Sequence, residues 1–162
     1  MKVKASKIDL MKLKAIADYL FGKGAGDALL KGEMVEVIKS KRTGRIREVY
    51  VDGVLVATIR ASDGFLLPTI EGARKLISLG SYSKIVVVPN DVAEFIAKGR
   101  TLFAKHVLKA DPGIRAGEEV VVVDEQGRVV AVGRARLTGI EMVRAKRGIA
   151  VKIRKGVYEG SQ

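Results

Sequence analysis

The sequence predicts an α+β fold made of two small domains. Three observations support this prediction: helical patterns alternate with short strand patterns, tight-turn signals separate the strands, and a polar link over residues 81–84 divides the 162 residues. A hydrophobic content of 48% is sufficient to form packed cores. We therefore expect one domain over residues 1–80 and another over residues 83–158.

The first domain is expected to combine helices with an antiparallel meander. Apolar residues at helical spacing over residues 8–21 predict an amphipathic helix that packs on a core through Ile8, Met11, Ala15 and Tyr19, joined by Leu13, Ile16 and Leu20. The glycine-rich residues 22–33 indicate a flexible turn with a helical turn near residues 27–30. A nucleotide-phosphate loop is disfavoured there, because no Gly-Lys-Ser/Thr follows at the required spacing.

Three strand patterns follow, over residues 34–40, 47–51 and 54–59. Asp52-Gly53 between the last two predicts a two-residue hairpin turn. Pro68-Thr69 predicts the start of a helix that ends at Gly80, since proline near the start and glycine beyond the end are typical of helix termini.

The second half is expected to form a small β barrel, because its strands are short and its turn signals are frequent. It begins with a strand over residues 85–88 and a helix from Asp91 that breaks at Gly99, followed by a short basic strand that reaches Val107. Strands are also expected over residues 120–123, 129–138 and 149–154, with a short helix or turn over 139–147. The first of these is apolar on both faces and should lie centrally in the sheet.

The charge points to a polyanionic partner. Thirty basic residues against 18 acidic ones give a net charge of +12 and a pI of about 10.0, which favours nucleic acid. The alternative is a charge-rich surface of a heat-adapted protein, consistent with 30% charged residues, no cysteine, one Asn and two Gln. Heat adaptation alone would not require such unequal signs.

Composition argues against several classes of site. Without cysteine and with a single histidine, the chain has no disulfide, no thiol metal site and no histidine-rich metal site, and no metal or cofactor is expected. The acids Glu118-Glu119 and Asp124-Glu125 are adjacent, so on a strand they would point to opposite faces and would not form a catalytic pair. With no long apolar run and a charged amphipathic start, we expect a cytoplasmic protein that does not contact a membrane.

A cluster of cations surrounds the first turn of the meander. Two interpretations fit it equally well: a solvated hairpin tip, or a mobile finger that contacts phosphates. We call this cluster the basic loop, and its members are Lys39, Lys41, Arg42, Arg45 and Arg47.

A set of spaced residues in the second half resembles the PUA domain, named for pseudouridine synthases and archaeosine transglycosylases. The resemblance spans residues 83–158 and rests on Val88, Asp91, Ala93, Ile96, Gly99, Leu102, Phe103, Ala104, Val107, Ala110-Asp111, Gly117-Glu118-Glu119-Val120, Val123, Val130-Ala131-Val132-Gly133, Glu141-Met142 and Gly148-Ile149-Ala150-Val151. The first half, with LLPTIEGARKLI directly ahead, resembles the pre-PUA region of archaeal transglycosylase C-terminal portions. The resemblance implies a small α+β pre-PUA-like domain followed by a PUA-type β pseudo-barrel.

The resemblance also implies binding to structured RNA such as tRNA or rRNA, through the first helix, the glycine-led strand after it and the last strand. The matching positions are Lys98, Gly99, Arg100, Leu102, Phe103, Lys105, His106, Val107, Lys146, Arg147, Gly148 and Ile149. Many members have Pro-Gly where this chain has Lys105-His106, and a charged contact could replace it.

Purely structural roles are also consistent with some of these residues. Leu102 and Phe103 are also typical of a barrel core. His106 lacks a neighbouring carboxylate or nucleophile and is interpreted as a surface hydrogen-bonding residue.

The sequence therefore predicts a non-catalytic RNA-binding protein that assists RNA modification, ribosome assembly or translation initiation. One alternative is the RNA-binding subunit of a split archaeosine-type tRNA-guanine transglycosylase, which would act with a catalytic subunit. Another is a protein-interaction module in ribosome assembly, whose basic surface would meet an acidic protein or a ribosomal particle.

Overall fold

The chain divides into two compact units in a computed structural model, which describes residues 1–78, 80 and 82–159. The first unit is Met1–Tyr82, and the second begins at Ser83. Both units contain helices and strands, so the predicted α+β class is confirmed. Leu79 in the predicted helix and Ser81 in the predicted link lie outside the described residues.

The first unit is built on a five-stranded antiparallel sheet. Its strands follow in chain order: β1 (Lys2–Lys4), β2 (Val35–Lys39), β3 (Ile46–Val51), β4 (Val54–Ile59) and β5 (Leu66–Pro68). The predicted meander is confirmed. At the predicted hairpin turn, Asp52 and Gly53 have φ angles of 49° and 82°, the left-handed conformation that such a turn requires. The sequence did not predict the two edge strands, β1 and β5, each of which is three residues long.

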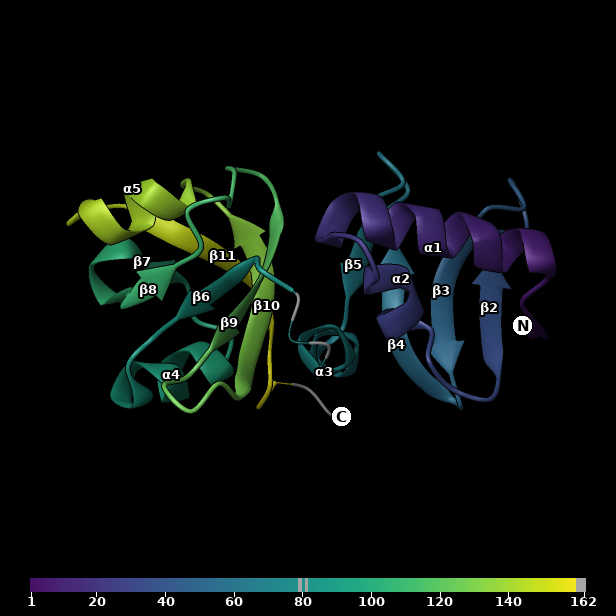
Figure 1. The fold of residues 1–162 in the computed structure, drawn as a ribbon, viewed down its shortest axis with the longest axis horizontal. Coiled ribbons are helices and arrows are strands. Elements are labelled where there is room, and N and C mark those ends of the chain that lie inside the picture. The colour runs from purple at the N-terminus through teal and green to yellow at the C-terminus, as the bar shows by residue number, and fades with distance from the viewer. Residues whose placement is uncertain (79, 81, 160–162) are drawn as a thin grey trace. The chain divides into compact units, whose positions relative to one another are not determined.

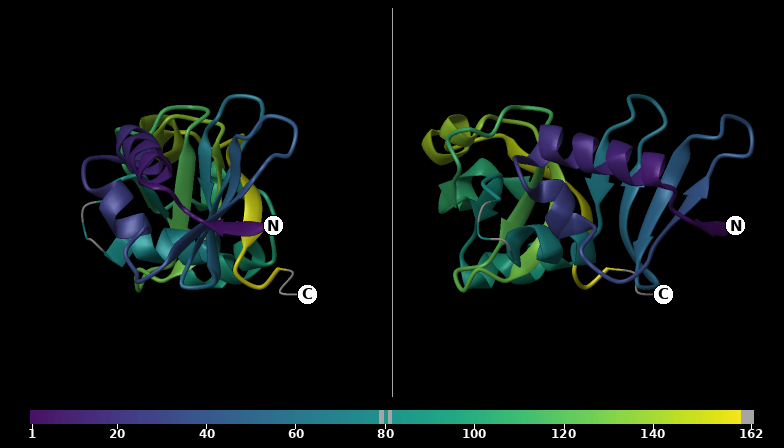
Figure 2. Two further views of the ribbon diagram at one scale, coloured as in Figure 1. Left: turned by 90° about the vertical axis from the view of Figure 1, so that its right-hand side faces the viewer. Right: turned by 45° about the vertical axis from the view of Figure 1, so that its right-hand side comes forward.

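One helix, α1 (Lys7–Phe21), runs along a face of this sheet (Figures 1 and 2). Ser6 caps it by accepting a hydrogen bond from the backbone N–H of Asp9 at 3.0 Å. The helix is confirmed, but its predicted core face is wrong in part. Leu13, Ala17 and Phe21 are buried, whereas Ile8, Met11, Ala15 and Tyr19 are exposed.

Two shorter helices complete the first unit. Helix α2 (Ala25–Leu29) confirms the helical turn expected near residues 27–30 and begins two residues earlier. A Cβ at Gly26 would come within 2.7 Å of the Lys14 backbone, so glycine permits close packing on α1. Helix α3 (Ile70–Ser78) packs on β4 and β5. Pro68 ends β5 and does not start α3; instead the Thr69 hydroxyl accepts a hydrogen bond from the backbone N–H of Gly72 at 3.1 Å.

The second unit is a curled six-stranded sheet. Its order is β7 (Leu102–Phe103), β11 (Ile149–Gly156), β10 (Val129–Ala135), β9 (Glu119–Val123), β6 (Ile85–Val87) and β8 (Lys109–Ala110). Strands β6 and β9 are parallel and the other pairs are antiparallel. The edge strands β7 and β8 are joined by one 3-10 turn, η1 (Ala104–His106), so the sheet must curl to bring its edges together. As predicted, residues 120–123 are buried in a central strand.

Helices α4 (Asn90–Ala97) and α5 (Gly139–Arg144) lie at opposite ends of this curled sheet (Figures 1 and 2). Helix α4 begins one residue before the predicted Asp91. The core joins Val86 and Val88 to Ile96 of α4, Met142 of α5 and the inward residues of β9 to β11. The second unit therefore has a core of its own.

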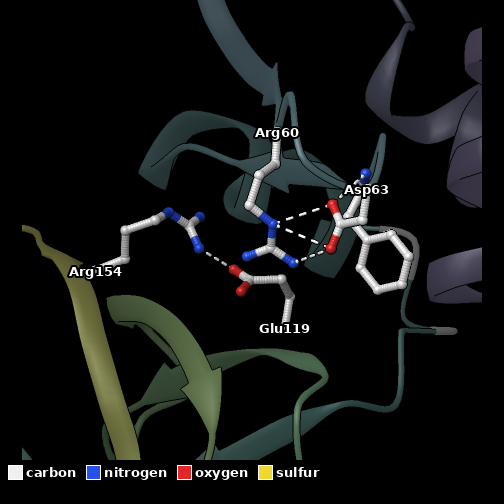
Figure 3. A network of polar contacts seen from close by, with 5 residues as sticks. Arg60, Asp63, Glu119 and Arg154 are labelled. Atoms are coloured by element: carbon white, nitrogen blue, oxygen red, sulfur yellow. Dashed lines mark hydrogen bonds and ion pairs between the residues drawn. The ribbon is translucent and has the colours of Figure 1, made fainter.

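Ion pairs involve three of the four acids in the two adjacent acidic pairs, and the fourth, Glu125, accepts a hydrogen bond from the Asn90 backbone N–H at 3.0 Å. Glu119 is buried and pairs with Arg154, as Figure 3 shows, while Glu118 accepts from Lys84 at 2.5 Å. Burial acts to raise the pKa of Asp124, but hydrogen bonds from the backbone and guanidinium of Arg128 outweigh it and hold that pKa below its usual range. These carboxylates therefore make structural contacts within the second unit.

Candidate RNA-binding face

The two predicted parts of the RNA-binding face are neighbours in the second unit. Strand β7 pairs with β11, placing Phe103 opposite Ile149, and the Ala104 N–H donates to the Gly148 carbonyl at 2.9 Å. Together they shape a shallow pocket of about 240 Å³, lined by Phe103, Lys105, Lys146, Arg147 and Gly148. Residues more than 40 positions apart in sequence thus surround one hollow.

Among the described residues, the cations of this face form no ion pairs, unlike three others in the unit. Lys84, Arg128 and Arg154 form ion pairs with acids in or beside β9. Within the described part of the unit, none of the five lysines and arginines of the predicted face has an acidic partner, and all five are exposed: Lys98, Arg100, Lys105, Lys146 and Arg147. Unpaired cations attract phosphate without losing an internal salt bridge.

The two apolar residues of β7 have different roles. Leu102 is fully buried opposite Val151, so its side chain belongs to the core and its assignment to the RNA surface is corrected. Phe103 is 44% exposed and lines the pocket. Successive side chains on a strand point to opposite faces, which explains the difference.

Two glycines flank the face with left-handed backbone conformations. Gly99 ends the helix as predicted, with φ of 93°, but a Cβ there would meet the carboxylate of Glu159. Its backbone is therefore packed within the unit instead of lying open to a ligand. Gly148 has φ of 91° and open space where a Cβ would lie, so its backbone is accessible beside the pocket.

The predicted basic strand is shorter than expected. Lys105 and His106 lie in the turn η1 and not on β7, because the chain bends there to reach β8. Both side chains are exposed, whereas Val107 is half-buried against the core. Turn geometry directs Lys105 to the pocket, while His106 does not line it.

The basic loop belongs to the first unit, at the turn between β2 and β3. Its five members are exposed. The turn is closed by internal hydrogen bonds, among them Ser40 N–H to the Arg45 carbonyl at 2.8 Å, and both interpretations of its exposed cations fit this geometry. Lys39 lies 3.2 Å from the carboxylate of Asp9.

A search of the described residues finds no cluster of three or more His, Asp and Glu side chains that could hold a metal ion. In the same part of the chain, no helix is long and apolar enough to cross a membrane.

Two domain families match the chain in succession. Residues 11–82 match the patch-forming domain C2 of tRNA-guanine transglycosylase, and residues 84–157 match the PUA domain.

Several archaeal relatives match almost the whole chain. A tRNA-guanine(15) transglycosylase of Methanobrevibacter smithii is 44% identical over 157 residues, which is 96% of this chain and 24% of that protein. The enzyme of Pyrococcus furiosus with the same name is 46% identical over 151 residues, 93% of this chain and 25% of that protein. The chain thus spans about a quarter of the length of these relatives.

Solved structures share the whole architecture. A hypothetical protein from Pyrococcus horikoshii is 27% identical with a TM-score of 0.79, covering 98% of this chain and 96% of that one. A PUA-domain protein from Thermoplasma acidophilum, 24% identical, shows the same fold with a TM-score of 0.70, covering 96% of this chain and 93% of that one.

The curled sheet, its terminal helices and the match over residues 84–157 define a protein that carries a PUA domain, an RNA-binding module. More particularly, the chain joins the C2 domain of tRNA-guanine transglycosylase to this PUA domain, the arrangement found in the C-terminal regions of archaeal tRNA-guanine transglycosylases.

Proposed function

We propose that this chain supplies RNA recognition, and no catalytic group, to a tRNA-guanine transglycosylase reaction whose chemistry is performed elsewhere. The observation that carries the proposal is the pocket between β7 and β11, where an exposed ring lies among unpaired cations. The relatives favour this role over ribosome assembly or translation initiation, because their names specify tRNA modification and the chain corresponds to about a quarter of their length.

In this proposal the pocket binds tRNA. Lys105, Lys146 and Arg147 neutralise phosphates, and Arg100 extends the positive charge along the turn after α4. Phe103 offers a flat surface on which one base can stack. The accessible backbone beside Gly148 permits close approach. A cytoplasmic location accompanies the proposal, since the tRNA is there.

The test is a titration of tRNA with a variant in which Arg100, Lys105 and Arg147 are all replaced by alanine. The dissociation constant should rise at least about tenfold, and the slope of log affinity against log salt should fall by about three, because each lost phosphate contact removes about one released ion. The measurement is a gel shift or filter-binding titration at several salt concentrations.

The matched control removes three exposed cations outside the pocket, with Arg115, Arg134 and Lys152 replaced by alanine. It loses the same charge, so a purely nonspecific surface effect would weaken binding equally. Equal affinities of the two triple variants would show that the assigned face is wrong.

A further inference from the structure

A continuous groove runs along α1 in the first unit. It consists of two hollows of about 380 Å³ and about 310 Å³, which share Ile16 and Gly64. The turns at residues 40–45 and 60–65 rise beside α1, as the right-hand view of Figure 2 shows. The larger hollow has an apolar lining of Leu13, Ile16, Ile46 and Ile59.

The groove is positively charged because its acids are already neutralised. Asp9 accepts hydrogen bonds from the Ser6 backbone N–H at 3.0 Å and from Lys39 at 3.2 Å. Burial acts to raise the pKa of Asp9, but these partners outweigh it and lower that pKa, so the carboxylate stays ionised and paired. The carboxylate of Asp63 accepts hydrogen bonds from Nε and Nη2 of Arg60, at 3.0 and 2.7 Å (Figure 3).

Two cations of the groove remain available. Lys12 on α1 and Arg45 in the basic loop line the larger hollow, and neither has an acidic partner among the described residues. Lys41 and Arg42 continue the positive charge along the same turn. The rim of the groove therefore attracts anions over an apolar floor.

Exposed aromatic rings extend this floor. Phe65 and Tyr19 line the smaller hollow and are 37% and 86% exposed. The whole chain has four Phe, four Tyr and no Trp, and two of these eight aromatic rings line the groove. A basic groove with aromatic platforms is the usual arrangement for binding a single-stranded nucleic acid, whose bases stack while its phosphates meet cations.

The net charge of the first unit equals that of the second, which supports a role in RNA binding for both. Residues 1–82 hold 15 basic and nine acidic residues, a net charge of +6, and residues 83–162 hold the same numbers. If only the PUA domain met RNA, the first half would have no need of this excess.

We propose that the groove along α1 binds a single-stranded segment of RNA, as a second contact separate from the pocket of the PUA domain. The bases lie over Ile16, Phe65 and Tyr19, and the phosphates meet Lys12 and Arg45. This proposal rests on the proposed function only in taking RNA as the ligand. The sequence indicates the basic loop as a candidate site but not α1, because the apolar pattern of residues 8–21 predicts a helix packed on the core.

The test uses the full chain and a fluorescein-labelled single strand of ten uridines, followed by fluorescence anisotropy at low salt. A variant with Lys12, Arg45 and Phe65 replaced by alanine should bind the oligonucleotide at least about tenfold more weakly, because it loses two phosphate contacts and a stacking ring. The matched control, with Lys23, Lys31 and Val54 replaced by alanine, loses the same charge and an exposed apolar side chain elsewhere in the unit. Its affinity should change less than about twofold, within the range of ordinary surface substitutions.

A single charge reversal, Arg45→Glu, tests the same groove without relying on correct folding of the triple variant. The Arg45 side chain is exposed on a turn, so this substitution should not disturb the fold. It too should weaken binding, by about fivefold or more, because a cation at the rim becomes an anion.

Unchanged binding by Arg45→Glu and by the groove variant would overturn the proposal. Loss of oligonucleotide binding only in the variant of Arg100, Lys105 and Arg147 would also overturn it, while leaving the proposed function intact. Binding of a ten-residue glutamate peptide as tightly as the RNA would contradict it as well, by showing that the groove prefers an acidic polypeptide.

Discussion

Strand β7 consists of two adjacent residues, one of which belongs to the core and the other to the proposed binding pocket. Leu102 and Phe103 are adjacent and both apolar, yet the first is fully buried in the core and the second forms part of an open pocket among cations. The alternation of a strand assigns one residue to stability and its neighbour to binding. Substitution of Leu102 should therefore lower stability, and substitution of Phe103 should weaken binding.

Leu102→Ala should lower the free energy of unfolding by about 2–5 kcal/mol, the usual cost of emptying a buried leucine site. Phe103→Ala should change it by less than about 1 kcal/mol, because nearly half of that side chain is already exposed. In a tRNA titration, Phe103→Ala should raise the dissociation constant by about fivefold or more through lost stacking. Urea unfolding and the titration check both values, and a large loss of stability in Phe103→Ala would assign that ring to the core.

At the scale of elements, the position of the turn that carries Lys98 and Arg100 depends on how α4 meets β11. The Tyr158 N–H donates to the Ala97 carbonyl at 2.8 Å, directly beyond β11. A Cβ at Gly156 would overlap that same carbonyl oxygen and come within 2.8 Å of the Gly99 nitrogen. Only a residue without a side chain lets the strand and the helix end approach this closely.

Gly156→Ala should therefore destabilise the second unit by about 1–3 kcal/mol, the range for overpacked sites, and should weaken tRNA binding by displacing the turn. Gly127→Ala is a suitable control, since Gly127 also lies in the second unit but has open space where a Cβ would lie. Its φ of 81° gives it a cost from backbone strain alone, without displacement of the turn and without an effect on affinity. Thermal unfolding and tRNA titration of both variants measure the contrast; equal affinities would mean that this packing does not position the cations.

At the scale of the whole molecule, positive charge is divided equally between the two units, and the two domains match about a quarter of the transglycosylase relatives. An RNA ligand that meets both units would gain affinity from each, because two linked sites act at a high effective concentration. Such a chain would contribute binding energy to a reaction performed by other residues.

This role predicts the outcome of a base-exchange assay. Release of radiolabelled guanine from tRNA by the catalytic region of an archaeal transglycosylase should increase at least about tenfold when this chain is added, mainly through a lower KM, because the chain supplies binding energy. The chain alone should release none. The variant of Arg100, Lys105 and Arg147 should lose most of the stimulation, and equal stimulation by that variant would separate RNA binding from this reaction.

The sequence by itself determined the α+β class, the meander with its Asp52-Gly53 hairpin, the burial of residues 120–123 and the PUA character of the second half. These features depend on local patterns: alternation, turn chemistry and the spacing of a known domain. The pairing of β7 with β11, which unites Phe103 with Lys146 and Arg147, could be expected only through the resemblance, because no local rule joins residues so far apart.

Only the tertiary structure decided the face of α1 that packs inward. Apolar residues occur around most of that helix, so Ile8, Met11, Ala15 and Tyr19 form as regular a stripe as the buried Leu13, Ala17 and Phe21. Packing against the sheet and α2 selects one stripe, which leaves Ala15 and Tyr19 of the other stripe to line the groove. Periodicity alone fixes that a helix is amphipathic, whereas the shape of its neighbours fixes which side is covered.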